Sequence, residues 1–381
     1  MSWKVESVLQ QRLAMIHRIE ELKRPVHEVA KEFGVSRKTA NKWLARHRGK
    51  QWCALIDQSH RPKHSPDKTA DAIEEAVVEE RRRHNWGPRK IHRLLCDRGL
   101  SMPSVRTVAN ILVRRDCITC AQARPEPLPP QPFERPEPNQ LWQLDHKGPI
   151  EVAREKICPL TVLDDCSRYC LCFAPVRDVT MPTAWNVLWG LFADVGMPES
   201  ILCDNAFKGT YMSPGLSWFD ARLVRLGIHP IHGRAYHPQT QGKVERLHGT
   251  IQRELVNFNA RRDTLEHFAE DAEQWRMTYN TIRPHEALGD LSPAARWKPS
   301  PRPRPAQLPE VSYPSDAMTR RVSFSGDIRY HGARILVGRG LTGQTVRLEE
   351  QEQQLVVHYA WKQLRSISTD LLRPGRSDKM V

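Results

Sequence analysis

Two short blocks decide the fold of this chain: Ile-Leu-Cys-Asp-Asn-Ala at 201–206 and His-Pro-Gln-Thr-Gln-Gly-Lys-Val-Glu-Arg at 237–246. The first is an apolar run that ends in Asp204, which predicts a buried strand with a carboxylate at its open end. The second begins with turn-forming residues, after which apolar residues recur at helical spacing. Glu245 is therefore expected in the first turn of a helix.

A third acid repeats the pattern of the first. Leu-Trp-Gln-Leu-Asp at 141–145 is an apolar run that ends in Asp145. Taken singly, each acid is also typical of a turn or of a solvated helix surface. A fold that joins two strand ends to a helix start would bring Asp145, Asp204 and Glu245 together, and the prediction depends on that convergence.

Three neighbouring carboxylates need a counter-charge. Two of them about 4 Å apart, at an effective dielectric of about 20, repel by about 4 kcal/mol. Oxygen-only ligation suits Mg²⁺ or Mn²⁺, which also bind substrate phosphates. Two such ions can activate a nucleophile and stabilise the leaving oxygen of a phosphodiester. The sequence therefore predicts a two-ion Mg²⁺ or Mn²⁺ site for phosphodiester chemistry.

Longer motifs surround the three acids, and with them the sequence resembles the integrase-core DDE transposases of bacterial insertion sequences, relatives of the retroviral integrases. The motifs are WQLD at 142–145, DDCSRY at 164–169, CDN at 203–205, HPQTQGKVER at 237–246 and YNTIRPH at 279–285. The resemblance covers 140–298 and implies a ribonuclease H-like core. It also implies that Asp145, Asp204 and Glu245 are the catalytic, metal-binding triad.

Two features depart from the family pattern. Ala206 follows the Asp-Asn pair where the family often has glycine, and the 40 residues between Asp204 and Glu245 exceed the common spacing. We expect the extra length in a loop at 208–218, because insertions are best tolerated in loops.

Charge indicates a polyanionic partner. The 381 residues have a formal net charge of +14 and a sequence pI of about 9.5. Residues 1–120 contain 25 Lys/Arg against 14 Asp/Glu, an excess of 11 positive charges in less than a third of the chain. General solubility is the plain alternative, but this asymmetry favours double-stranded DNA. The length predicts two to four domains.

No run of apolar residues is long enough to span a membrane, and the N-terminus lacks a secretory apolar region. We therefore expect a cytoplasmic protein, associated with the nucleoid when it binds DNA. The 9 cysteines are an odd number, which favours reduced thiols. Cys117 and Cys120 form a lone pair without a second pair at zinc spacing, so a structural zinc is not favoured.

Residues 1–50 have the pattern of a helix-turn-helix DNA-binding module. A helical apolar stripe over 5–22 precedes a short helix ending at Phe33, a turn at Gly34 and an N-cap at Ser36. The second helix would expose residues that face the major groove in DNA-binding versions of the motif: Arg37, Lys38, Asn41 and Lys42. A plain helical hairpin with a solvated basic face is the alternative.

Residues 65–120 repeat this organisation, with helices expected over 69–83, 89–98 and 105–114. The expected interior residues of the last helix are Val105, Val108, Ile111 and Leu112. The candidate DNA contacts of this second module are Arg89, Arg106, Asn110 and Arg114. Phosphate contact is the expected role of the arginines.

A proline-rich linker over 121–138 leads to the expected catalytic core at 139–298. The core should contain strands at 141–150, 157–164, 168–177, 199–203 and 228–231, and helices at 181–195, 215–226, 243 onward and 263–281. This βββαβαβα order is that of the ribonuclease H-like fold. Asp164 and Asp165 rival the triad, but two acids between strands are more typical of turn chemistry.

Basic residues accompany Glu245 on its helix. Lys243 and Arg246 are candidate contacts to the DNA backbone, with a solvated basic stripe as the equal alternative. His237 could contact a phosphate, although Pro238 after it favours a structural turn.

A second linker, 299–310, leads to residues 311–381, where apolar residues alternate at period two between Gly and polar turns. This pattern predicts a small β-barrel. The predicted fold class is therefore multidomain α+β: two helix-turn-helix modules, a ribonuclease H-like α/β core and a C-terminal β-barrel.

These observations predict a metal-dependent polynucleotidyl transferase: a DDE transposase that binds the ends of a mobile element, cleaves the 3′ end and transfers the strand to target DNA. Joining two ends implies a homo-oligomer, at least a dimer on DNA. Two alternatives remain at this stage. One is a ribonuclease H-type nuclease, and the other is a DNA-binding regulator with an inactive core.

Overall fold

The computed structural model describes residues 7–48, 52–57, 68–118, 134–208, 215–233, 242–258, 260–372 and 377–378. His237, Cys120, most of the 121–138 linker and most of the 208–218 loop lie outside these residues. The chain divides into two compact units, Met1–Lys68 and Thr69–Val381. Each unit is described by itself below.

The first unit is a helix-turn-helix module. Its elements are α1 (Val8–Glu20), α2 (Val26–Glu32), α3 (Arg37–His47) and the short η1 (Trp52–Leu55). Gly34 turns the chain with a φ of 66°, and the Ser36 side chain caps α3 by accepting a hydrogen bond from the Thr39 amide. Both features are as expected from the sequence. The helices enclose Ile16, Val29, Ala40 and Leu55.

The second unit begins with three helices: α4 (Asp71–His84), α5 (Pro88–Asp97) and α6 (Val105–Arg114). They pack around Trp86, Ile91, Val108, Ile111 and Leu112. The expectation that Val105 is interior is wrong, since its side chain is 39% exposed. Val105 is the first residue of α6. Because a helical side chain leans toward the N-terminus of its helix, the Val105 side chain extends past the start of α6 rather than into the core.

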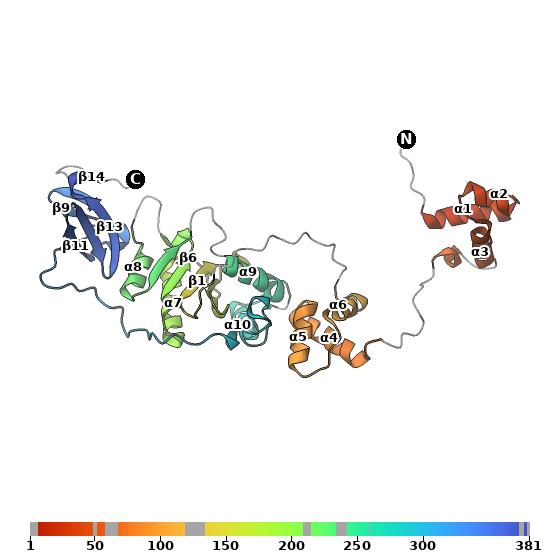
Figure 1. The fold of residues 1–381 in the computed structure, drawn as a ribbon, viewed down its shortest axis with the longest axis horizontal. Helices are drawn as coiled ribbons and strands as arrows, with labels where there is room; N and C mark the ends of the chain where they lie inside the picture. Colours follow the sequence, from red (N-terminus) through yellow and green to blue (C-terminus); the bar gives the residue numbers. More distant parts are fainter. Residues whose placement is uncertain are drawn as a thin grey trace. The chain divides into compact units, whose positions relative to one another are not determined.

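A five-stranded sheet in the order β5-β4-β1-β6-β7 organises the next part of this unit (Figure 1). Its strands are β1 (Leu141–His146), β4 (Leu160–Asp164), β5 (Cys170–Ala174), β6 (Ser200–Cys203) and β7 (His229–His232). β1 is antiparallel to β4 and parallel to β6. The predicted order of strands and helices is present, with one addition: the first strand ends at His146, and a hairpin of β2 (Ile150–Val152) and β3 (Glu155–Ile157) follows it.

Helices cover both faces of the sheet. One face packs against α7 (Met181–Val195) and α8 (Trp218–Arg225), and the other against α9 (Gly242–Ile251) and α10 (Leu265–Thr281). α9 continues into a π-helical segment, η4 (Gln252–Val256). Trp142 and Leu144 of β1 belong to the cluster with α7 and α8. Since successive strand residues point to opposite faces, Gln143 and Asp145 lie on the α9 side.

The C-terminal strands form two sheets, β14-β10-β9 and β13-β12-β11-β8, rather than the expected closed barrel. The strands are β8 (Thr319–Arg321), β9 (Asp327–Tyr330), β10 (Ala333–Leu336), β11 (Thr345–Gln351), β12 (Gln354–Tyr359), β13 (Lys362–Ser368) and β14 (Ser377–Asp378). The alternation of apolar residues correctly identifies the interior, with one exception. Phe324 is 91% exposed because it lies in the turn between β8 and β9.

The two C-terminal sheets share their hydrophobic core with α8. Ala221 and Val224 of α8 pack among the strand residues, and the Trp361 indole donates a hydrogen bond to the Val224 carbonyl over 2.7 Å.

Among the helices of the described residues, none is long and apolar enough to cross a membrane.

We expect Gly340→Ala to destabilise the contact between α8 and the C-terminal sheets. A Cβ at Gly340 would lie 2.5 Å from the Trp218 amide nitrogen and closer still to the backbone of Leu216 and Ser217. Overpacking of this kind costs about 1–3 kcal/mol, measured as the free energy of unfolding in urea. Gly148→Ala is the matched control, because a Cβ at Gly148 meets nothing within 4 Å. Equal stability of the two variants would contradict the close packing of α8 against the sheets.

Candidate active site and nucleic-acid interface

Asp145 and Asp204 leave adjacent parallel strands at the same edge of the sheet. Leu144 of β1 is in register with Cys203 of β6, so the next residue on each strand is one of the two acids. Both aspartates are half-buried. The Asp204 carboxylate also accepts a hydrogen bond from the Ala206 amide over 3.0 Å, which fixes the turn that follows the strand.

Glu245 lies in the first turn of α9 and is exposed. Hydrogen bonds tie the start of α9 to β1: the Val244 amide donates to Gln143 Oε1 over 3.3 Å. Gln143 Nε2 in turn donates to Asp165 Oδ1 over 2.8 Å, and Lys243 Nζ lies 2.6 Å from the same oxygen. This network fixes the helix that carries Glu245 relative to the strand that carries Asp145.

Asp164 and Asp165 are both fully buried, and both carboxylates accept hydrogen bonds from other groups of the protein. Asp164 accepts hydrogen bonds from the Asn139 amide and from the amide and hydroxyl of Ser167. Asp165 joins the network at the start of α9. These contacts support the interpretation that Asp164 and Asp165 stabilise a turn. Asp165 also helps to position the start of α9, a role that the sequence did not reveal.

The three acids influence one another electrostatically. The pKa of Asp145 is raised to about 6, first because the carboxyl is buried, then because of the negative charge of Asp204, with a further contribution from Glu245. Asp204 and Glu245 are therefore close enough to Asp145 to disfavour its ionisation. The structure places Asp145 and Asp204 at neighbouring strand ends, and Glu245 near enough for its charge to act on Asp145; their common role as a triad stays a prediction.

His248 lies beside the acids and was not identified from the sequence. Its Nδ1 is 3.8 Å from Asp145 Oδ2, and its Nε2 is 2.8 Å from the Thr161 hydroxyl. Burial lowers the pKa of His248 to about 4, with smaller contributions from neighbouring cations, so the imidazole is neutral at pH 7. The signal in the sequence is its spacing, three residues after Glu245 on the same face of α9.

A divalent cation would suit this arrangement chemically. The donors are carboxylate oxygens, which Mg²⁺ and Mn²⁺ prefer. The pKa of Asp145 is raised first by burial and then by the charges of Asp204 and Glu245, and a bound cation would offset these charges. In the described part of the chain, however, no three His, Cys, Asp or Glu side chains are gathered with the geometry of a metal site. The three carboxylates lie near the same ends of the strands, but they do not surround a common point.

We expect Asp145→Asn to stabilise the metal-free protein. The folded state retains the Asp145 proton up to its raised pKa of about 6, whereas the unfolded state loses it near the ordinary aspartate pKa of 3.8. Stability therefore falls as the pH rises through this window and stays lower above it. Removing the charge should restore at most about 3 kcal/mol at pH 7, measured by urea unfolding in EDTA. An unchanged or lower stability, relative to the exposed control Asp194→Asn, would contradict this electrostatic interpretation.

The candidate DNA contacts of the first module all lie on one exposed surface. Arg37, Lys38, Asn41 and Lys42 of α3 are exposed. Their positions suit contact with a nucleic acid, and their role stays a prediction.

The candidates of the second unit are in different environments. Arg106 and Asn110 of α6 are exposed, as is Arg246 of α9. The others have acidic partners within the protein: Arg114 pairs with the buried Glu74, Arg89 with Glu286 and Asp290, and Lys243 with Asp165. For these three, the observed contacts are structural, and a DNA contact stays a prediction.

Models of known protein families match these regions of the chain. Residues 135–238 and 226–293 match two models of the integrase core domain. Residues 7–51 and 39–112 match two models of homeodomain-like domains. The core matches include the positions of Asp145, Asp204 and Glu245, and the helical matches include α3 and most of α6.

Similar segments occur in viral polyproteins. The Gag-Pro-Pol polyprotein of mouse mammary tumor virus (strain BR6) is 32% identical over 119 residues, which are 31% of this chain and 6% of the polyprotein. That of sheep pulmonary adenomatosis virus is 26% identical over 212 residues, 53% of this chain and 11% of the polyprotein. The chain thus matches only a small part of these curated relatives.

Two solved structures are also similar in part. The HTLV-2 integrase catalytic core domain in complex with magnesium (trimeric form) is 16% identical, with a TM-score of 0.32, over 42% of this chain and 97% of that one. A simian T-cell lymphotropic virus intasome in complex with PP2A regulatory subunit B56 gamma is 15% identical, with a TM-score of 0.40, over 80% of this chain and 100% of that one. By the sequence matches, this chain combines an integrase-type core segment with homeodomain-like helical segments.

Proposed function

We propose that this protein is a DDE transposase of the bacterial insertion-sequence type, with a ribonuclease H-like core. It would bind the ends of a mobile element, cleave the DNA to expose a 3′-hydroxyl and join that end to target DNA. The observation that supports the proposal is the placement of Asp145 and Asp204 at neighbouring ends of parallel strands, with Glu245 in the first turn of α9 acting electrostatically on Asp145.

In this proposal Asp145, Asp204 and Glu245 hold Mg²⁺ or Mn²⁺ ions. Such ions, when bound, supply a counter-charge for the phosphodiester and lower the pKa of an attacking water or hydroxyl. The protein's own residues position the site. Gln143 and Asp165 hold the start of α9 against β1, and Asp204 is fixed by the turn after β6.

The helical modules would supply DNA recognition. α3 presents Arg37, Lys38, Asn41 and Lys42 on an exposed surface, where the second helix of DNA-binding helix-turn-helix modules contacts base edges. Arg106 and Asn110 on α6 are the corresponding candidates in the second module. Because two element ends must be joined, the active form is proposed to be at least a dimer on DNA.

The test is a cleavage and joining assay with the full chain, Mg²⁺ or Mn²⁺, and a duplex carrying the sequences that flank its coding region. The proposal predicts new 3′-hydroxyl ends, and joined products when the duplex is supplied already cut. Cleavage of the RNA strand of a hybrid without joining would identify a ribonuclease H-type nuclease instead. Specific binding without cleavage or joining would identify a DNA-binding regulator.

A further inference from the structure

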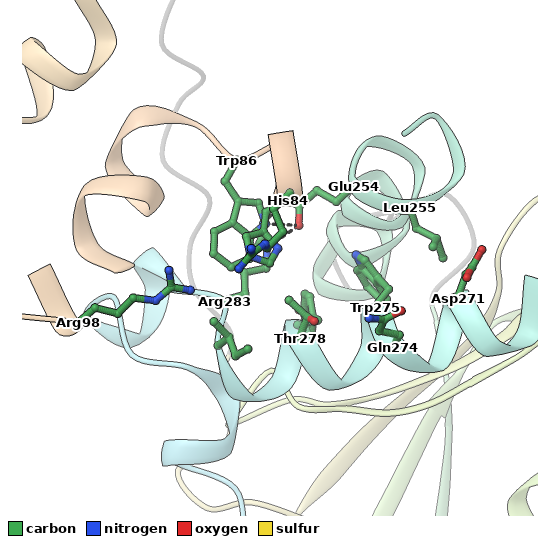
Figure 2. Close-up of a pocket in the computed structure, with 13 residues that line it drawn as sticks. His84, Trp86, Arg98, Glu254, Leu255, Asp271, Gln274, Trp275, Thr278 and Arg283 are labelled. Carbon is green, nitrogen blue, oxygen red and sulfur yellow. Dashed lines mark hydrogen bonds and ion pairs between the residues drawn. The ribbon is translucent and has the colours of Figure 1, made fainter. Parts of the chain in front are cut away.

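The second helical module contacts the core through a buried polar cluster, shown in Figure 2. Trp86, after α4, donates its indole hydrogen to Glu254 Oε2 over 3.1 Å. Glu254, in the π-helical segment η4, also accepts two hydrogen bonds of 2.9 Å from Arg283. A cavity of about 630 Å³ lies beside this cluster. The contact places the start of α5 close to the flank of α9.

A separate cavity of about 320 Å³ lies along that flank, between α9, the loop after α10 and α5. Its walls contain six cationic side chains: Lys90, Arg168, Lys243, Arg246, Arg253 and Arg283. Three of them, Lys243, Arg246 and Arg253, come from one continuous helix, α9 with η4. The cavity has a single acidic lining residue, Glu286, and that side chain lies 2.6 Å from Arg89.

Half of these cations have no acidic partner. Arg168 pairs with Glu134, Lys243 with Asp165 and Arg283 with Glu254. Lys90, Arg246 and Arg253 form no ion pair with any of the residues that the structure describes.

The pKa values of two wall residues, Lys90 and His285, are lowered by burial and by the neighbouring cations. Burial lowers the pKa of Lys90, and the charge of Arg283 lowers it further. Burial also lowers the pKa of His285 to about 3, with Arg283 and Lys90 acting in the same direction. The cavity therefore has three cations that form no ion pair among the described residues, together with a neutral histidine. Of the three, Lys90 is influenced by the charges of Glu254 and Glu286. An anion is the ligand that this electrostatic environment favours.

The basic surface extends beyond this cavity. Another cavity, of about 340 Å³, shares Lys90 and Arg253 with the 320 Å³ cavity and is also lined by Arg81. Its one acidic lining residue, Glu254, is paired with Arg283. Positive charge thus continues along the seam between α5 and η4. A linear polyanion matches a continuous seam better than a single small ion does, because it presents successive charges at regular intervals.

We propose that this seam, defined by Lys90, Arg246 and Arg253, binds phosphate groups of the DNA backbone and that the bound DNA holds the second helical module against the core. The proposal rests on the proposed function for the identity of the polyanion. Lys90 belongs to α5, whereas Arg246 and Arg253 belong to the helix that carries Glu245. Bound phosphate would remove the repulsion between these elements and so favour their contact.

The test measures the affinity of the full chain for a fluorescein-labelled duplex of arbitrary sequence at several salt concentrations. Each lost phosphate contact should reduce the slope of log K against log salt by about 0.9. We expect this reduction for Lys90→Gln and for Arg253→Gln, and about twice as much for the double variant. Lys156→Gln is the matched control, an exposed lysine on β3 outside both cavities, and should leave the slope unchanged.

Thermal unfolding without DNA separates binding from folding. The double variant should be at least as stable as the wild type, since it removes cations that form no ion pair among the described residues. If the double variant has the wild-type slope of log K against log salt, and the wild type cleaves and joins DNA, phosphate binding at the seam would be contradicted while the proposed function would stand. A reduced slope in a protein whose wild type neither cleaves nor joins would keep the seam and overturn the function. Stabilisation by inorganic phosphate that the double variant loses, with an unchanged DNA slope, would assign the cavity to a free anion and overturn the DNA proposal.

Discussion

Asp204→Asn should lower the rate of DNA cleavage by the full chain by about 10²–10³-fold while leaving its affinity for uncut DNA unchanged. Asp204 follows β6, and the neighbouring parallel strand β1 carries Asp145 next to its last residue, His146. Asn keeps the size and the hydrogen bond from the Ala206 amide, but it removes the negative charge that a divalent cation needs. Losing a group that stabilises charge in the transition state lowers the rate by about 10²–10³-fold.

The measurement is the rate of 3′-end formation on the flanking duplex, with anisotropy of the same duplex as the binding readout. Asp194→Asn is the matched control, since Asp194 is an exposed aspartate near the end of α7. Both variants should bind DNA as the wild type does. Cleavage by Asp204→Asn at the wild-type rate would show that the site lies elsewhere.

Glu254→Ala should have the largest effect on stability. Glu254 and Arg283 are almost fully buried, with side chains 7% and 8% exposed. Removing the carboxylate leaves the Arg283 guanidinium unpaired and the Trp86 indole without its acceptor. Breaking a buried pair from one side costs about 3–5 kcal/mol, measured as the free energy of unfolding in urea.

Glu270→Ala is the control for this prediction. Glu270 is 66% exposed and pairs with Arg261, which also pairs with Asp271. Exposed pairs of this kind contribute about 0–1 kcal/mol, so the control should be nearly as stable as the wild type. Equal losses in the two variants would mean that the contact between the second helical module and the core is not organised by Glu254.

The sequence predicts the local elements of this protein well because their signals are local. The apolar runs that end in Asp145 and Asp204 predict these acids at strand ends, and the structure puts them at neighbouring ends of β1 and β6. The caps Ser36 and Ser104 begin α3 and α6 through hydrogen bonds to amides three residues later. Each of these features depends on residues within one turn or one strand.

Contacts between distant segments could not be predicted in this way. Nothing near Trp86 in the sequence indicates Glu254 as its partner, and nothing near Gly340 indicates the close approach of α8. The period-two pattern at 311–381 identifies strands and their buried faces. Whether such strands close into a barrel depends on pairing between them, and here they form two open sheets.

The positioning residues of the site were missed for a related reason. Gln143 looks like one polar residue within a strand, and Asp165 looks like part of a turn. Only the folded structure shows that both contact the start of α9. His248 has a weak signal in its spacing from Glu245, but its contact with Thr161 again joins segments far apart in the chain.

The most direct test of the account is the position of Mn²⁺ in crystals of the full chain, located by anomalous scattering. We predict a Mn²⁺ ion coordinated by Asp145 and Asp204 at about 2.1 Å from their oxygens, with Glu245 turned toward the same ion or a second one. Mn²⁺ bound at other residues, with these three carboxylates left apart, would contradict the central claim that they form one metal-dependent active site.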